Sequence, residues 1–323
     1  MDSETGNSDR RQLGVWLLRL CISALLLTLI FYFVPFSQVW AAARQVSAPL
    51  WLASLILFLC GHAASAAKWR ILIGNGISYR QAFRAHLAGL AANLALPSVA
   101  GGDVVRAGLV MKHAEDKGRL AMGSLADRLL DTLGLALLAL GSAWIAWQSR
   151  LDAEIWLGWP LLGLVALAAG GFAMALALDR FKQGGESSGK FMRLLSTLIH
   201  SAAELAKSPG RLLLCLLISV TVQCLFVAIN IAFARAAHVE APVAAWFYAW
   251  TTAKIIAIAP ISLGGLGVRE ASMAALLRPF GANPAEVVAI GLVWQSLLYV
   301  SGLIGFLVQV RRPAPKAELE QAL

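Results

Sequence analysis

The sequence reads PSVAGGDVVR at residues 97–106 and PISLGGLGVR at residues 260–269. Both stretches follow the pattern P-x-x-x-G-G-x-x-x-R, and they lie 163 residues apart, about half the length of the 323-residue chain. Composition alone would give about 0.005 further copies of such a pattern by chance. We therefore interpret the two stretches as corresponding parts of an internal repeat.

The composition around this repeat is that of a membrane protein. Apolar residues make up 59% of the chain and charged residues 14%, whereas soluble domains carry about 25% charged residues. The 4 cysteines lie inside apolar runs without C-x-x-C spacing, which excludes a disulfide-stapled secreted module and a zinc site. Because helices satisfy their backbone hydrogen bonds internally across hydrocarbon, we predict an all-α polytopic membrane protein.

Long apolar runs predict about six full transmembrane helices, at roughly 20 residues per span. Two further apolar segments are broken midway by Pro and Gly-Gly, and we expect both to be re-entrant. The predicted full spans are residues 15–36, 48–67, 122–148, 155–178, 211–234 and 285–310, and the broken segments are residues 82–113 and 243–280. Tryptophans near the span ends, among them Trp40, Trp69 and Trp144, fit an interfacial belt.

The basic residues predict the orientation of these spans. The net charge of +9 indicates basic cytoplasmic loops that face anionic lipid headgroups rather than a nucleic-acid partner. The opposite loops carry far fewer basic residues, namely Arg44, Arg150 and Arg235. The basic clusters are Arg10 and Arg11; Lys68, Arg70, Arg80 and Arg84; Lys112, Lys117 and Arg119; Arg180, Lys182, Lys190, Arg193 and Lys207; and Arg311, Arg312 and Lys316. We therefore expect both termini to lie in the cytoplasm.

With this orientation, the second half of the chain repeats the order of elements of the first half with inverted membrane topology. Two full spans, one broken segment and a further full span make up residues 15–150, and the same order follows in residues 151–312. Cytoplasmic tails are predicted at residues 1–14 and 313–323. Inverted-topology repeats with paired Pro- or Gly-interrupted segments are typical of transporters whose substrate site lies near the bilayer midplane.

The broken segments carry a chemistry that suits an anion. A helix that begins after a Gly-Gly turn presents unpaired backbone N–H groups, and these groups together with the helix dipole attract phosphate. Arg106 and Arg269 lie about one turn inside these helices, where each guanidinium could bind a phosphate bidentately. The alternative is structural: Gly101 and Gly102 permit a tight turn, Asp103 caps the helix, and Arg106 reaches the cytoplasm.

Charged residues inside the spans are a second signal. Arg128 and Asp131 are i,i+3 neighbours in the third full span, and intramembrane charges usually face the bundle interior along a substrate path. The alternative is that they form a self-neutralising pair, or a partner for Arg106, that only holds the fold. Lys254 and Glu270 flank the second break, where they either pair with each other or line a path.

These two signals define one set of candidate substrate-binding residues. The set is Pro97, Gly101, Gly102, Asp103, Arg106, Arg128, Asp131, Lys254, Pro260, Gly264, Gly265, Arg269 and Glu270. Gln223, Asn230 and Gln295 are instead interpreted as interhelical hydrogen-bonding residues. The carboxylates have arginines rather than histidines or cysteines beside them, so we predict no catalytic residue, metal or cofactor.

At these residues the chain resembles the transmembrane flippase domain of the lysylphosphatidylglycerol synthase family, the membrane half of the bacterial multiple peptide resistance factor. The matching elements are Pro97, Gly101, Gly102, Asp103 and Arg106; Asp127, Arg128 and Asp131; and Pro260, Gly264, Gly265, Arg269 and Glu270. The resemblance covers about residues 12–312 and implies a transporter that carries aminoacylated phosphatidylglycerol to the outer leaflet. The chain stops at Leu323, without room for the soluble aminoacyl-transferase domain, so we expect no lipid synthesis.

With this resemblance, we predict a flippase that moves a phospholipid or lipid-linked headgroup between the leaflets of the bacterial inner membrane. Its expected partners are membrane lipids with anionic or aminoacylated headgroups, and a separate biosynthetic enzyme or a second copy of the chain are further candidates. Two other functions stay open: a non-transporting membrane partner of a lipid or envelope biosynthetic enzyme, and a small-anion carrier. We do not expect an enzyme, because Asp103, Asp127 and Asp131 are the only candidates for acid–base or metal chemistry.

Overall fold

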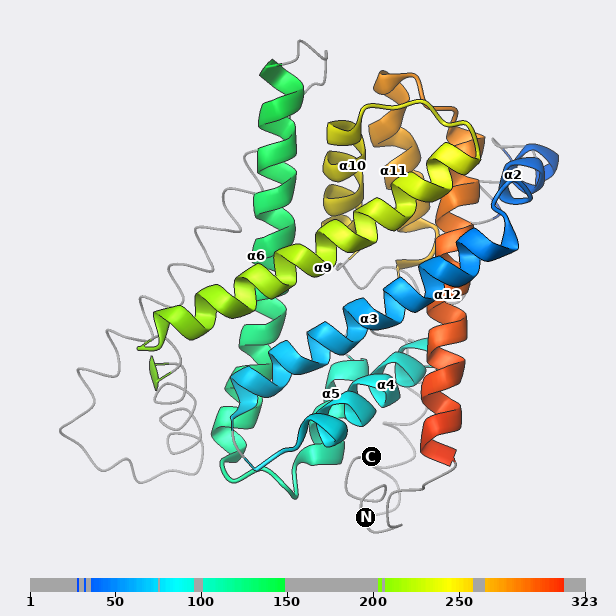
Figure 1. Cartoon of the computed structure of the whole chain (residues 1–323). Coiled ribbons are helices and arrows are strands. Elements are labelled where there is room, and N and C mark those ends of the chain that lie inside the picture. The colour runs from blue at the N-terminus through cyan, green and yellow to red at the C-terminus, as the bar shows by residue number, and fades with distance from the viewer. Residues whose placement is uncertain are drawn as a thin grey trace, which may run out of the picture.

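The described part of the chain is built from α-helices. The computed structural model describes residues 36–74, 76–95, 101–148, 207–257 and 265–310, together with Thr28, Tyr32, Ala203 and Glu204. Within these residues the only regular elements are α-helices and a short 3-10 turn, and there is no strand (Figure 1). The all-α class expected from composition is confirmed.

Four helices are long and apolar enough to cross a membrane. They are α3 (Ala48–Ile73), α6 (Lys117–Gln148), α9 (Pro209–Ala236) and α12 (Pro284–Val310). They coincide with the predicted spans at residues 48–67, 122–148, 211–234 and 285–310. The predicted span at 155–178, most of the one at 15–36 and both predicted tails lie outside the described residues, so the count of six remains a prediction.

Each predicted broken segment contains two short helices. The first holds α4 (Tyr79–Ala95) and α5 (Gly101–Val110), and the second holds α10 (Val243–Ile256) and α11 (Val268–Leu277). At 1.5 Å per residue none of them spans a hydrocarbon core of about 30 Å. In Figure 1, α4 and α5 lie in the lower half of the molecule, whereas α10 and α11 lie in the upper half. The described chain is completed by α2 (Phe36–Ala43) and the 3-10 turn η2 (Arg278–Phe280).

The helix contacts have an internal symmetry. The helices α3, α4, α5 and α6 occur in the same order as α9, α10, α11 and α12. When each helix of the first set is exchanged for its counterpart, the contacts among these eight helices map onto one another. For example, α4 packs against α12 as α10 packs against α6, and α4 packs against α5 as α10 packs against α11. A repeated packing scheme therefore accompanies the repeated sequence motif.

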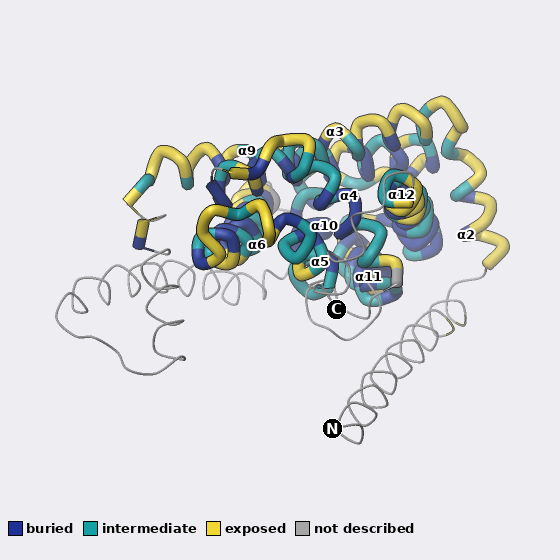
Figure 2. Tube along the Cα trace, turned by 90° about the horizontal axis from the view of Figure 1, so that it is seen from below, coloured by how far each residue is buried: buried dark blue, intermediate teal, exposed yellow. Residues whose placement is uncertain are grey.

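The outer surface of the helices is apolar. Exposed leucine and isoleucine side chains lie on α3 and α9, namely Leu52, Ile56, Leu57, Leu213, Leu214 and Leu217. Figure 2 shows these outer faces as exposed, with α4 and α10 packed inside the molecule. A contiguous exposed apolar surface of this kind is typical of contact with lipid.

Small residues bring the inner helices close together. A Cβ atom on Gly305 of α12 would lie 2.2 Å from the carbonyl oxygen of Leu87 on α4, and one on Gly302 would lie 2.4 Å from Leu94 Cδ1. On α5, a Cβ atom on Gly102 would lie 2.4 Å from the carbonyl oxygen of Gly89. Close approach of this kind drives helix association in membranes, where lipid is as apolar as the core. These glycines fix α4 between α5 and α12.

Two residues that the sequence places at the membrane surface lie in the interior. Helix α3 continues to Ile73, beyond the predicted end at residue 67, so that Lys68 is 1% exposed and Trp69 is fully buried. The Lys68 ammonium has two carboxylate partners on α6, the buried Asp127 and the half-buried Asp131, and the Trp69 indole N–H donates to Ser124 Oγ at 3.0 Å. The assignment of Lys68 to a cytoplasmic loop and of Trp69 to an interfacial belt is therefore wrong.

Candidate functional site

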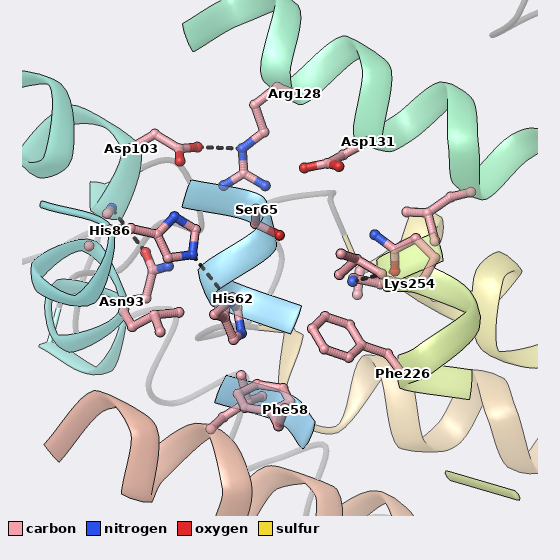
Figure 3. A pocket seen from close by; sticks show the side chains of 18 of the residues that line it. Phe58, His62, Ser65, His86, Asn93, Asp103, Arg128, Asp131, Phe226 and Lys254 are labelled. Atoms are coloured by element: carbon pink, nitrogen blue, oxygen red, sulfur yellow. Dashed lines mark hydrogen bonds and ion pairs between the residues drawn. The ribbon is translucent and has the colours of Figure 1, made fainter. Parts of the chain in front are cut away.

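A cavity of about 280 Å³ lies where the inner helices meet. Its wall includes residues of α3, α4, α5 and α6 and also of α9, α10, α11 and α12. The polar and charged lining residues, several of which are drawn in Figure 3, are His62, Ser65, His86, Asn93, Asp103, Arg106, Asp127, Arg128, Asp131, Thr132, Gln223, Lys254, Arg269 and Gln295. Both sets of repeated helices thus contribute to one polar site.

Most of the predicted site residues meet in this cavity. The residues that line it are Gly102, Asp103, Arg106, Arg128, Asp131, Lys254 and Arg269. Gly101, Gly265 and Glu270 are described but do not line it, although Glu270 binds Arg269. Pro97, Pro260 and Gly264 lie outside the described residues. The two motifs, far apart in sequence, therefore contribute an arginine each to the same site.

On the α5–α6 side of the cavity, cations and carboxylates alternate. Arg106 Nη2 lies 2.6 Å from Asp127 Oδ2, and Arg106 Nε lies 3.2 Å from Asp103 Oδ1. Lys68 Nζ lies 3.0 Å from Asp127 Oδ1 and 2.5 Å from Asp131 Oδ1. With the ion pair between Asp103 and Arg128, the network runs through Arg128, Asp103, Arg106, Asp127, Lys68 and Asp131. Its three cations and three carboxylates compensate one another, as buried charges must.

This network corrects two of the sequence interpretations. Arg106 does not reach the cytoplasm: it is 4% exposed, and its guanidinium lies 4.6 Å from the centre of the Trp69 ring. Arg128 and Asp131 do not serve as a self-neutralising pair on α6, because Arg128 binds Asp103 on α5 and Asp131 binds Lys68 on α3. The charges of α6 therefore tie three helices together.

The second motif forms a smaller cluster. Arg269 Nε donates to Glu270 Oε1 at 3.1 Å, and Arg269 Nη2 donates to Gln295 Oε1 on α12 at 3.0 Å. Glu270 is fully buried, and its Oε2 accepts the backbone N–H of Gly267 at 2.8 Å. At the first motif, the backbone N–H of Gly102 donates to Asn93 Oδ1 at 2.9 Å. At the start of each helix, a side chain therefore accepts a hydrogen bond from a backbone N–H group that we had expected to bind an anion.

Among the described residues of the site, Lys254 has no ion-pair partner. Its Nζ donates to the neutral Gln223 Oε1 at 2.9 Å and lies 5.3 Å from the centre of the Phe226 ring. Among the described residues no carboxylate lies within 4 Å of it. Of the two alternatives for Lys254 and Glu270, the pair does not form, because Glu270 binds Arg269, whereas Lys254 lines the cavity. In the described part of the chain, the site and its network hold five cations against four carboxylates, and Lys254 is the cation without a carboxylate partner.

Of the three neutral polar residues predicted to form interhelical hydrogen bonds, two do so and one does not. Gln223 accepts from Lys254 on α10, and Gln295 accepts from Arg269 on α11, so both form interhelical bonds as predicted. Asn230 instead donates to Phe226 O on its own helix at 2.8 Å. Both glutamines also line the cavity, which adds them to the site.

Sequence reasoning missed a pair of histidines at the centre of the cavity. His62 Nδ1 on α3 lies 3.0 Å from His86 Nε2 on α4, and His86 Nδ1 lies 3.4 Å from Arg106 Nη1. Figure 3 shows the two rings joined in this way. The histidines are 24 residues apart on different helices and match no motif, so no local signal could have identified them.

Four aromatic side chains form an aromatic wall of the cavity, and two of them lie next to Lys254 and Arg269. The rings of Phe58 and Phe226 stack with centroids 5.0 Å apart, and Trp294 meets Phe58, Phe226 and Trp250 edge to face. All four side chains line the cavity. Within the described residues no group of three or more His, Cys, Asp or Glu side chains is placed to hold a metal ion. The site therefore offers both charged groups and aromatic rings to a ligand.

A comparison with known protein families agrees with the resemblance seen in the sequence. The family described as "Lysylphosphatidylglycerol synthase TM region" matches residues 16–305, which is nearly the whole chain. No curated protein matches the chain significantly. The matched region includes all the described residues that line the cavity.

Proposed function

We propose that this chain, which belongs to the lysylphosphatidylglycerol synthase TM region family, moves a phospholipid or lipid-linked headgroup between the leaflets of the bacterial inner membrane. The observation that carries this proposal is the charged cavity enclosed by helices of both repeated sets. Charges at membrane depth are costly, and they face cavities that serve as substrate pathways. A transport site is a sufficient reason to keep so many of them in one place.

The dimensions of the cavity support a lipid headgroup as the ligand. A volume of about 280 Å³ corresponds to about nine water molecules in the liquid. That is room for a headgroup but not for two acyl chains, which would stay in the bilayer. The aromatic wall of Phe58, Phe226, Trp250 and Trp294 would contact the apolar part of such a molecule, while the charged side would bind its polar end.

The packing symmetry supports an inverted repeat made of residues 15–150 and 151–312. The contacts of α3 to α6 correspond to those of α9 to α12, and the two pairs of short helices lie in opposite halves of the molecule in Figure 1. We propose that each pair is re-entrant, from opposite sides, with both chain termini cytoplasmic. Movement of one repeat against the other would expose the cavity to each leaflet in turn.

The chemistry of the site favours transport over catalysis. Asp103, Asp127 and Asp131 each bind a lysine or arginine, and Glu270 binds Arg269. Carboxylates held in this way are poorly suited to accept a proton from a substrate. We therefore propose a transporter that changes no covalent bond.

Reconstitution tests the proposed function. The purified protein would be placed in liposomes that contain fluorescent phosphatidylglycerol, lysylphosphatidylglycerol or a neutral glycolipid, and an impermeant quencher would report the lipid in the outer leaflet. We expect faster exchange between leaflets than in protein-free liposomes, with selectivity for the headgroup. Equal rates with and without protein for every lipid would overturn the proposal.

A further inference from the structure

Arg106 fixes the direction of the hydrogen bonds between the two cavity histidines. A guanidinium can only donate, and Arg106 Nη1 lies 3.4 Å from His86 Nδ1, so this nitrogen is the acceptor. His86 therefore carries its proton on Nε2, which lies 3.0 Å from His62 Nδ1 and donates to it. His62 must then carry its own proton on Nε2.

This order leaves one donor without an acceptor. His62 Nε2 is buried and has no hydrogen-bond partner among the described residues. A buried N–H group without an acceptor is destabilising, and such groups are usually satisfied by water or a ligand. Because His62 lines the cavity (Figure 3), a molecule in the cavity can supply the missing acceptor.

Lys254 and this donor both lie near the ring of Phe226. The His62 ring centroid is 5.5 Å from that of Phe226, and Lys254 Nζ is 5.3 Å from the same centroid. All three residues line the cavity, so the imidazole and the ammonium both border it next to the Phe226 ring. One neutral N–H donor and one ammonium, without a carboxylate on the ammonium, make a site for a singly charged group that accepts hydrogen bonds.

The arginines of the two motifs do not offer such a site. Arg106 binds Asp127 and Asp103, and Arg269 binds Glu270 and Gln295. A cationic ligand would also be disfavoured. Two of the four aromatic side chains that line the cavity already have a cation beside the ring, Lys254 over Phe226 and Arg269 over Trp250.

We propose that Lys254 and His62 form a phosphate-binding subsite in the cavity. The Lys254 ammonium and the His62 Nε2–H group each donate to a non-bridging oxygen of one phosphate group, whose single negative charge neutralises the excess positive charge of the site. The phosphate belongs to a lipid headgroup if the proposed function holds, on which this part rests. Free inorganic phosphate presents the same chemistry.

Binding measurements on the purified full chain test the subsite without requiring transport. Native mass spectrometry or thermal shift in detergent would compare short-chain phosphatidylglycerol with diacylglycerol, which lacks the phosphate, and with inorganic phosphate. Lys254→Gln removes the ammonium, and the control Lys117→Gln makes the same change at an exposed lysine away from the cavity. His62→Asn removes the donor at Nε2, whereas His62→Gln retains an amide N–H near that position.

We expect phosphatidylglycerol to bind more tightly than diacylglycerol, with affinity at least ~10-fold weaker in Lys254→Gln and His62→Asn. Lys117→Gln should bind as the unmodified chain does, and His62→Gln should retain most of the affinity. Unchanged affinity in Lys254→Gln would overturn the proposal, and this variant alone decides if His62→Asn does not fold.

The binding and transport measurements together distinguish a failure of the subsite from a failure of the proposed function. If inorganic phosphate binds in a Lys254-dependent way and phosphatidylglycerol does not, the subsite stands and the lipid function falls. If the protein moves lipid in liposomes but Lys254→Gln and His62→Asn bind it normally, the function stands and the subsite falls.

Discussion

The ammonium of Lys68 lies 2.5 Å from the carboxylate of Asp131, which joins α3 to α6 in the interior of the protein. The same ammonium lies 3.0 Å from Asp127 and donates to Ser219 Oγ on α9 at 2.9 Å. One buried cation thus holds three of the four candidate spanning helices together beside the cavity.

Removing this cation should destabilise the protein strongly. Lys68→Met leaves the buried Asp127 and the half-buried Asp131 without this cation, and breaking one half of a buried ion pair costs about 3–5 kcal/mol. Thermal unfolding in detergent measures the loss, with the exposed Lys117→Met as the matched control. Adding Asp131→Leu to Lys68→Met should restore part of the stability. Equal melting temperatures for Lys68→Met and Lys117→Met would show that the pair contributes nothing.

The contact between α4 and α12 depends on Gly305. A Cβ atom there would lie 2.2 Å from the backbone oxygen of Leu87, which cannot move without shifting α4, whereas one on Gly141 would meet nothing within 4 Å. Gly305→Ala should therefore lower the free energy of unfolding by about 1–3 kcal/mol. Gly141→Ala should leave it unchanged or raise it slightly, because alanine favours a helix. Similar melting temperatures for both variants would contradict the close packing.

Arg106 is expected to stabilise the fold rather than bind the ligand directly. Arg106→Gln leaves Asp127 and Asp103 without this cation, and it should reduce the free energy of unfolding by about 3 kcal/mol. The exposed Arg80→Gln is the control, for which we expect no loss. If Arg106 were an unpaired ligand of the phosphate, as its position in the motif suggests, its removal would leave the unfolding transition of the ligand-free protein unchanged.

The inverted repeat makes a prediction about accessibility. Ser78 precedes α4 and Glu240 precedes α10, and both are exposed. In a background without the native cysteines, an impermeant thiol reagent should label Ser78→Cys from the cytoplasmic side and Glu240→Cys from the opposite side. Labelling of both positions from the same side would contradict the inverted topology.

The sequence predicts the spanning helices well because their apolar runs are long. It places the end of α3 too early, since hydropathy falls at Lys68, whereas the helix continues to Ile73. The reason lies 63 residues away, where Asp131 neutralises the lysine inside the protein. A partner so distant in sequence leaves no trace in a local pattern.

Some charged residues of the cavity could be predicted from the sequence. Arg128 and Lys254 stand out because charges are rare inside apolar segments, and both line the cavity. His62 and His86 do not stand out, because a single histidine in a helix is most often structural. Only the packing of α3 against α4 brings the two rings within 3.0 Å of each other. The roles of Arg106 and Arg269 likewise depend on carboxylates that the motif does not reveal.

The most direct test measures lipid exchange in liposomes that contain either the unmodified chain, Lys254→Gln or Lys117→Gln at equal protein content. Fluorescent phosphatidylglycerol and an impermeant quencher give the rate at which inner-leaflet lipid becomes accessible. We predict fast exchange for the unmodified chain and for Lys117→Gln, and a rate at least ~10-fold lower for Lys254→Gln. Exchange no faster than in protein-free liposomes for the unmodified chain would contradict lipid transport by this cavity.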